Sequence, residues 1–258
     1  MKKSLLEKTA DKLVDAFVNN KIIKPLPTKF TKKLKEAQKL RKLCESKVKD
    51  QVIGFKAAGT GIPVMKKLKE KKPFYAAIFK KNFIKSGKKV KINKSTLGIE
   101  LEVCYLIKKN FFSSKGSIAM KNVSKHISHM SPCIEVVGYR QKKKGITSFG
   151  DLCSDFGANV KFLIGQKKKY KRINIGSLKT NIANKKIGQS VDGNTNTVYI
   201  NPLNSLKFVL NELKKDKVNL DKDFYVFTGS TVGVVPILGK GLYTGKIDKL
   251  GTAKAIIH

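Results

Sequence analysis

Tryptophan is absent from the sequence, and histidine and cysteine are scarce, with three and four residues among 258. The cysteines are well separated and form no Cys-x-x-Cys pair, so we expect buried free thiols rather than a zinc site or a disulfide framework. His126 and His129 are spaced i, i+3 with no Cys, Asp or Glu close by, so we expect a solvated helix face rather than a metal site there. The cysteines are Cys44, Cys104, Cys133 and Cys153.

Long hydrophobic runs are also absent. The longest apolar runs, such as Val103–Ile107 and Val232–Leu238, are far shorter than the ~18 to 20 residues that a membrane-spanning helix needs. The first segment, residues 1–17, carries charges from Glu7 to Asp15, which interrupt any hydrophobic region of a signal peptide. We therefore expect a cytoplasmic protein that does not cross a membrane.

Acidic residues number 18 against 55 basic ones, which gives a formal net charge of +37. Such a charge attracts nucleic-acid backbones. However, all the basic residues except Arg41, Arg140 and Arg172 are lysine, whereas bidentate recognition of phosphate and guanine favours arginine. The lysines are scattered and accompany no aromatic-basic motif of an RNA-binding module. We expect a solvated lysine surface and no specific nucleic-acid partner.

The chain begins with a helical pattern. Ser4 and Glu7 have the spacing of a capping box, and apolar residues follow at helical intervals, so a helix is predicted over residues 4–19. Two prolines separate it from a second amphipathic pattern, which predicts a helix over residues 31–48.

From Gln51 onward the pattern changes to short β-rich runs separated by turn residues. Helical intervals are predicted within this region at residues 120–129 and 203–213. The sequence therefore predicts an α+β fold in a single domain, 1–258, with a helical segment at 1–50 and a mixed, strand-rich core at 51–258. The predicted strands are VIGFKA, KVKIN, IELEVCYLI, CIEVVGY, VKFLIG, TVYI, FYVFTG, LYTGKI and the terminal LGTAKAIIH.

The stretch GIELEV, Gly98–Val103, places two of the few carboxylates in an otherwise apolar strand. Strand alternation puts Glu100 and Glu102 on one face, which is either a solvent-facing polar surface or a site. A third carboxylate, Glu135, lies in a later apolar strand, and the intervening segment is long enough to bring the two strands side by side. Carboxylates clustered in a partly buried site take up protons or bind a hard cation such as Mg²⁺ or Mn²⁺.

Five segments of the chain resemble, in the same order, the hydratase/decarboxylase branch of the fumarylacetoacetate hydrolase superfamily. They are Gly54–Lys56, GIELEV, PCIEVVG, Asn201–Leu206 and Phe227–Ser230. That branch includes 2-oxopent-4-enoate hydratase and 4-oxalocrotonate decarboxylase, and the resemblance extends from the N-terminal helices to the terminal strand. It implies a strand-rich core of the fumarylacetoacetate-hydrolase type preceded by helices.

The resemblance also implies roles for particular residues. Glu100, Glu102 and Glu135 would be the ligands of Mg²⁺ or Mn²⁺. The glutamate at the third ligand position also resembles the hydratase/decarboxylase branch, because the hydrolase branch usually has an aspartate at that position. Lys56 and Asp155 would be catalytic groups that carry protons.

Residues of the Phe227–Ser230 segment would bind substrate by the same resemblance, with Thr228, Gly229 and Ser230 lining the pocket near the substrate carboxylate. The chain departs from the family pattern in two places. It reads Ala57–Gly61 where the family has a hydrophobic-Gly-Leu-Thr-Ser type of segment, and it has Phe156 where an asparagine is often found. Neither departure touches the three glutamates.

The activity that the resemblance implies is that of a lyase of aromatic-compound catabolism: a metal-dependent hydratase that adds water to 2-hydroxypenta-2,4-dienoate (2-oxopent-4-enoate) to give 4-hydroxy-2-oxopentanoate. The alternative is a metal-dependent decarboxylase of a 2-oxo dicarboxylate of the 4-oxalocrotonate type, which needs the same glutamates. An alternative from another class is a basic nucleic-acid-binding protein on an inactive enzyme fold. The expected partners are a small 2-oxo or 2-hydroxy dienoic acid and, as in the family, further copies of the chain in a homo-oligomer.

Overall fold

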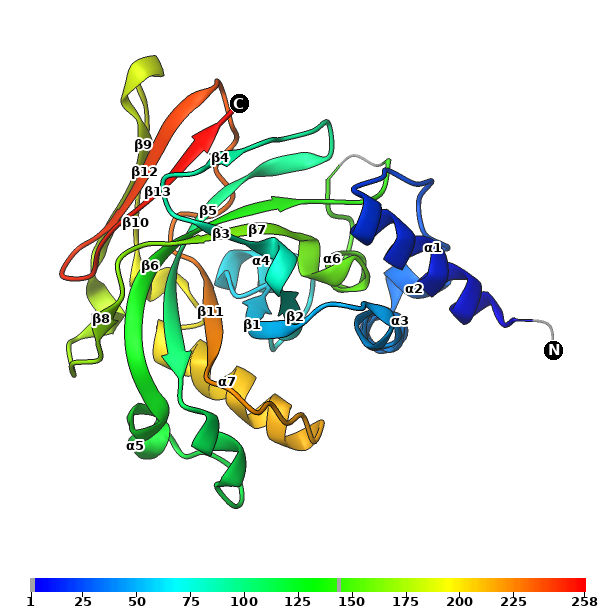
Figure 1. The fold of residues 1–258 in the computed structure, drawn as a ribbon, viewed down its shortest axis with the longest axis horizontal. Helices are drawn as coiled ribbons and strands as arrows, with labels where there is room; N and C mark the ends of the chain where they lie inside the picture. The colour runs from blue at the N-terminus through cyan, green and yellow to red at the C-terminus, as the bar shows by residue number, and fades with distance from the viewer. Residues whose placement is uncertain (1–2, 143–144) are drawn as a thin grey trace.

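Two β-sheets and a group of N-terminal helices make up the protein in the computed structural model, which describes residues 3–142 and 145–258 (Figure 1). The larger sheet consists of β1 (Val52–Ala58), β2 (Phe74–Phe79), β3 (Phe83–Lys85), β5 (Thr96–Ile107), β6 (Ile127–Gly138), β7 (Asn159–Ile164), β8 (Lys168–Lys169) and β11 (Phe224–Ser230). Its spatial order is β2-β1-β11-β5-β6-β7-β3, and β8 pairs with β6. The carboxylate-bearing strands β5 and β6 are therefore neighbours near the middle of this sheet.

Within the described residues, the smaller sheet has five strands. In spatial order they are β10 (Gln189–Asn194), β9 (Lys179–Asn184), β12 (Gly241–Ile247), β13 (Gly251–Ile257) and β4 (Lys89–Val90). The two sheets and the helices before them confirm the α+β class with a strand-rich core. The helices are α1 (Leu5–Asn19), α2 (Lys29–Lys32), α3 (Leu34–Lys47), α4 (Ile62–Lys67), α5 (Met120–Val123), α6 (Phe149–Ser154) and α7 (Pro202–Lys215). Short 3₁₀ turns lie at Lys80–Asn82, Lys109–Ser113, Ser124–His126, Phe156–Ala158, Ile175–Ser177, Lys185–Ile187 and Thr195–Thr197.

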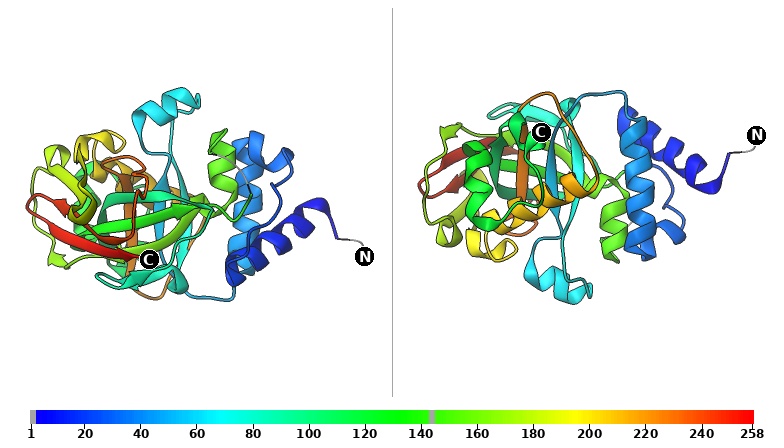
Figure 2. Two further views of the ribbon diagram at one scale, coloured as in Figure 1. Left: turned by 90° about the horizontal axis from the view of Figure 1, so that it is seen from above. Right: turned by 90° about the horizontal axis from the view of Figure 1, so that it is seen from below.

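The N-terminal helices gather at one end of the molecule, where α6 joins α1, α2 and α3 (Figures 1 and 2). The predicted capping box of α1 is confirmed, because Ser4 Oγ accepts from the Glu7 amide at 3.2 Å and the Ser4 amide donates to Glu7 Oε2 at 2.8 Å. The second predicted helix is interrupted at Lys33, whose backbone is extended. The reason is tertiary, since α6 packs there and Ser148 Oγ donates to the Thr31 carbonyl.

Some predicted elements were wrong. TVYI forms no strand, because Tyr199 and Ile200 have φ values of 42° and 76°, in the left-handed region and outside the extended region of a strand. The helix predicted over residues 120–129 ends early, and the His129 side chain lies on β6 rather than on a helix face. Only Lys89–Val90 of KVKIN pairs as a strand.

The thiol prediction is confirmed, since the four cysteines are free and buried. Within the part of the chain that the structure describes, the helices are all too short or too polar to span a bilayer.

Strand β1 lies parallel to β11 and carries the first motif of the site. At Gly54 the backbones approach so closely that a Cβ would lie 2.4 Å from the Tyr225 carbonyl oxygen. Glycine is therefore required at this position for the two strands to pair. Two residues further along, Lys56 pairs in register with Phe227, which brings it beside the strand that leads into Gly229 and Ser230.

Candidate metal centre and active site

Three carboxylates meet on one face of the β5–β6 pair. The antiparallel register sets Glu100 directly opposite Glu135 and Glu102 opposite Cys133, so the three glutamates lie on two successive pairs of the same sheet face. One carboxylate oxygen from each lies within 4.8 Å of the others. Glu102 and Glu135 are fully buried and Glu100 is half-buried, which excludes the solvent-facing alternative for this strand face.

The electrostatics of the cluster favour a cation. Burial, followed by the neighbouring Glu135, raises the pKa of Glu100 to about 7, and burial together with Glu100 raises the pKa of Glu102 to about 7. Burial likewise raises the pKa of Glu135. Glu102 Oε1 and Glu135 Oε2 are buried without a hydrogen-bond partner among the residues that the structure describes. Buried acceptors left in this state are costly, and a bound cation would satisfy them.

The donor set fits a hard divalent ion. Carboxylate oxygens are the ligands that Mg²⁺, Mn²⁺ and Ca²⁺ prefer, and a cluster without His or Cys does not suit zinc or copper. Glu100, Glu102 and Glu135 are the residues that would hold the ion. With three protein ligands, an octahedral ion keeps about three positions for water or substrate, as a catalytic site requires.

Lys56 is the cation beside the cluster. Its side chain is 4% exposed, and Nζ donates to Glu135 Oε1 and, at 3.2 Å, to the carbonyl of Gly157. Burial alone would lower the pKa of Lys56, but the nearby Glu135, Glu100 and Glu102 raise it, so the ammonium is charged. This burial distinguishes Lys56 from the exposed lysines that make up most of the charge of the protein.

The segment predicted to bind substrate divides into two parts. The Gly229 amide donates to Glu102 Oε2 at 2.8 Å, and Gly229 and Ser230 line a cavity that also contains Lys56 and Glu100. Thr228 is buried, and its hydroxyl donates to the Val103 carbonyl at 2.8 Å. Thr228 thus joins β11 to β5 and is not among the residues that line the cavity.

Gly229 is expected to tolerate no side chain. Its φ is +103°, and a Cβ would lie 1.8 Å from Thr60 Oγ1, so Gly229→Ala combines backbone strain with a steric clash. We expect the free energy of unfolding to fall by about 1–3 kcal/mol in urea denaturation. Gly188→Ala is the control, because Gly188 has a φ of +67° but no atom within 4 Å of the position that a Cβ would take, and it should lose clearly less. Equal losses in the two variants would contradict the clash.

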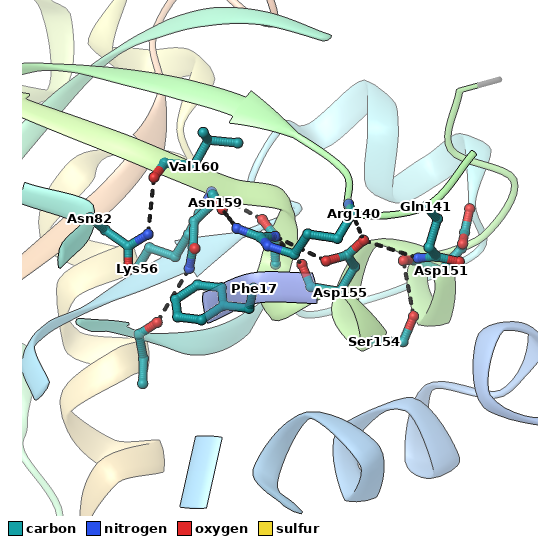
Figure 3. Close-up of polar contacts among 12 residues, drawn as sticks. Phe17, Lys56, Asn82, Arg140, Gln141, Asp151, Ser154, Asp155, Asn159 and Val160 are labelled. Atoms are coloured by element: carbon teal, nitrogen blue, oxygen red, sulfur yellow. Dashed lines mark hydrogen bonds and ion pairs between the residues drawn. The ribbon is translucent and has the colours of Figure 1, made fainter. Parts of the chain in front are cut away.

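Asp155 does not lie in this cavity. It is fully buried, and its carboxylate accepts from the Arg140 guanidinium at 2.9 Å, from the Arg140 amide at 2.8 Å and from Gln141 Nε2 at 3.1 Å (Figure 3). The chain that follows it, Phe156–Ala158, leads to the cluster, because the Gly157 carbonyl accepts from Lys56.

The cavity has a volume of about 470 Å³ and a largely aliphatic lining. Sequence reasoning missed both this lining and the Gly157 carbonyl. The aliphatic residues come from several separate segments, and no local pattern distinguishes them from ordinary core positions. They include Leu97, Val137, Ile146 and Leu152, Ile62 and Val64 around α4, and Val232 and Val234 after β11.

No family model matches the sequence, and no curated protein matches it. Solved structures do match. 4-Oxalocrotonate decarboxylase from Pseudomonas putida G7, complexed with magnesium and adipate, has a TM-score of 0.85 at 17% identity, over 100% of this chain and 99% of that one. The same enzyme complexed with calcium and acetate has a TM-score of 0.84 at 17% identity and the same coverage. 5-Carboxymethyl-2-hydroxymuconate delta-isomerase from Mycobacterium smegmatis has a TM-score of 0.55 at 11% identity, over 81% of this chain and 80% of that one.

The fold is therefore of the fumarylacetoacetate-hydrolase type, as the resemblance implied. The similarity to 4-oxalocrotonate decarboxylase extends over the whole of this chain, including the N-terminal helices. The similarity to the isomerase covers about four-fifths of this chain. At these identities the shared property is the fold.

Proposed function

We propose that this protein is a divalent-metal-dependent lyase of the hydratase/decarboxylase branch, and that it decarboxylates a 2-oxo dicarboxylate of the 4-oxalocrotonate type. The observation that carries the proposal is the buried cluster of three glutamates, with Lys56 beside it, at a cavity of about 470 Å³ that can admit a small dicarboxylate. The whole-length likeness to a decarboxylase complexed with magnesium and adipate supports this choice of reaction over the other reactions of the fold.

The roles follow from the positions of the side chains. Glu100, Glu102 and Glu135 would hold the ion, which when bound supplies a Lewis acid for the 2-oxo group of the substrate. Charged Lys56 attracts the anionic substrate and can donate a proton to the carbon that loses CO₂. The Glu102 carboxylate is kept in orientation by the Gly229 amide.

The aliphatic lining supports decarboxylation. Lys56 is the lone lysine or arginine among the described residues that line the cavity, so a second carboxylate held away from it contacts aliphatic side chains such as Leu97 and Val137. A carboxylate in such surroundings is poorly solvated, whereas neutral CO₂ has no charge to solvate. The breaking of the carbon–carbon bond therefore relieves an unfavourable contact.

The second candidate is the hydratase. Its substrate, 2-hydroxypenta-2,4-dienoate, has one carboxylate and a small apolar end. The aliphatic lining suits this apolar end, and a single carboxylate needs no second cation in the cavity. The order of the sequence motifs fits this reaction equally well. The two candidates differ in product and can be separated in one set of assays.

The test compares both substrates on metal-stripped protein before and after addition of Mg²⁺ or Mn²⁺. We expect metal-dependent loss of 4-oxalocrotonate absorbance with release of one CO₂ per molecule consumed, and slower turnover of 2-hydroxypenta-2,4-dienoate. Faster formation of 4-hydroxy-2-oxopentanoate would assign the hydratase instead. If the protein binds metal and turns over neither substrate, the proposed reaction is wrong.

A further inference from the structure

The turn that contacts Lys56 has an unfavourable backbone. Phe156, Gly157 and Ala158 all have left-handed conformations, with φ values of 51°, 67° and 58°. Left-handed non-glycine residues are strained, and such strain persists when the surroundings fix the backbone. The contacts that fix this turn therefore also fix the Gly157 carbonyl, which accepts from Lys56 Nζ at 3.2 Å.

Arg140 holds the turn at both ends. Its Nη1 donates to the Asp155 side chain at 2.9 Å and to the Asp155 carbonyl at 3.4 Å, and its Nη2 donates to the Asn159 carbonyl (Figure 3). Asp155 and Asn159 immediately flank the left-handed residues. The planar fork of arginine allows one side chain to make both sets of bonds, which a lysine ammonium cannot match in geometry.

Aromatic rings hold Arg140 in turn. Its guanidinium carbon lies 4.9 Å from the centre of the Phe17 ring and 5.4 Å from that of Phe156, and these two rings stack at 4.3 Å. Phe17 belongs to α1, so the N-terminal helix packs against both Arg140 and the Phe156 ring of the turn. Arg140 is 8% exposed and is not among the residues that line the cavity, so it does not contact substrate.

We infer that Arg140 is a positioning residue that places Lys56, because it clamps the Phe156–Ala158 turn whose Gly157 carbonyl orients the lysine. Lysine has many accessible side-chain conformations, and two fixed acceptors, Glu135 and Gly157, restrict it to one. Asp155, predicted from the sequence to carry protons, acts in this arrangement as the partner of Arg140. The placement of Lys56 follows from the geometry alone, and only its effect on turnover depends on the proposed function.

The test is Arg140→Lys, which keeps the charge and removes the fork. The rate at which an amine-reactive acylating reagent modifies Lys56 is measured by mass spectrometry on the folded protein at fixed pH. We expect the rate at Lys56 to rise relative to that at Lys161, a half-buried lysine that donates to the Lys81 carbonyl at 2.7 Å. In the decarboxylase assay we expect kcat to fall about 10- to 100-fold with KM little changed.

Arg41→Lys is the matched control. Arg41 is buried, pairs with Glu45 and stacks on Tyr75 at 4.7 Å, and among the described residues it forms no hydrogen bond or ring contact with the Phe156–Ala158 turn. It should leave the Lys56 modification rate and kcat unchanged. Asp155→Asn is a second variant that weakens one end of the clamp, and it should move both readouts in the same direction as Arg140→Lys, by less.

Unchanged modification of Lys56 in folded Arg140→Lys overturns the inference, whatever happens to turnover. A matching rise in Arg41→Lys also overturns it, because the effect would then be general loosening. Increased modification specific to the clamp variants supports the inference even if wild-type protein turns over neither substrate, in which case the proposed function alone fails.

Discussion

Glu102→Gln is expected to abolish the stabilisation of the protein by Mg²⁺ or Mn²⁺ and to stop turnover, while the metal-free variant is at least as stable as the wild type. Glu102 is fully buried, and its carboxylate repels that of Glu100. Glutamine has nearly the same shape without the charge, so the apo cluster loses repulsion as it loses a ligand. We expect metal affinity to fall by at least about a hundredfold, since even partners that only orient a ligand contribute 10- to 100-fold.

The measurement is thermal unfolding with and without Mn²⁺, supported by calorimetric titration with the metal alone. Glu36→Gln is the control, because Glu36 forms an ion pair with Lys39 on α3 and takes no part in the carboxylate cluster. This variant should keep the full metal-induced shift in melting temperature. An undiminished shift in Glu102→Gln would remove Glu102 from the ligand set.

Lys56→Met is expected to raise the affinity of the protein for the metal, whereas Glu102→Gln lowers it. Removal of the ammonium leaves the three carboxylates without their buried counter-charge, so the metal-free protein should lose about 3–5 kcal/mol of stability. The more negative cluster should bind Mn²⁺ more tightly, and bound metal should restore much of the lost stability. Turnover should nevertheless fall by about 10²- to 10⁴-fold, because the proton donor is gone.

Denaturant unfolding, Mn²⁺ titration and kcat together check this combination of effects. Lys161→Met is the matched control, since Lys161 is a half-buried lysine outside the cavity. It should change neither metal affinity nor kcat. Weaker Mn²⁺ binding in Lys56→Met would mean that Lys56 supports the ligands rather than competing with the cation for them. Unchanged turnover would exclude Lys56 as the proton donor.

The carboxylate cluster was predictable because its geometry is local. Alternation along one strand fixes the shared face of Glu100 and Glu102, and the next long strand pairs with it in antiparallel register, which brings in Glu135. The capping box of α1 was predictable for the same reason. In both cases the residues that decide the structure lie within one element or two neighbouring elements.

The surroundings of Asp155 and the backbone conformation of Tyr199 could not be predicted from local sequence patterns. Asp155 lies in a motif-like segment, yet its carboxylate binds the Arg140 guanidinium and is not among the groups that line the cavity. Tyr199 lies in a run with strand-like composition, but its amide donates to the Thr60 carbonyl at 3.0 Å in a left-handed conformation. Each depends on a contact between distant parts of the chain, about which local patterns carry no information.

The Glu100–Glu135 rung has a consequence for how the chain reaches its native state. Strands β5 and β6 are joined by a connection of fewer than 20 residues, from Ile107 to Ile127, so their pairing has a low contact order and is favoured early in folding. Like charges directly opposite each other disfavour such a pair. The pairing is therefore easier once protons or a cation neutralise this rung, so a divalent ion bound there would favour the native register of β5 and β6 during folding as well as in the folded protein.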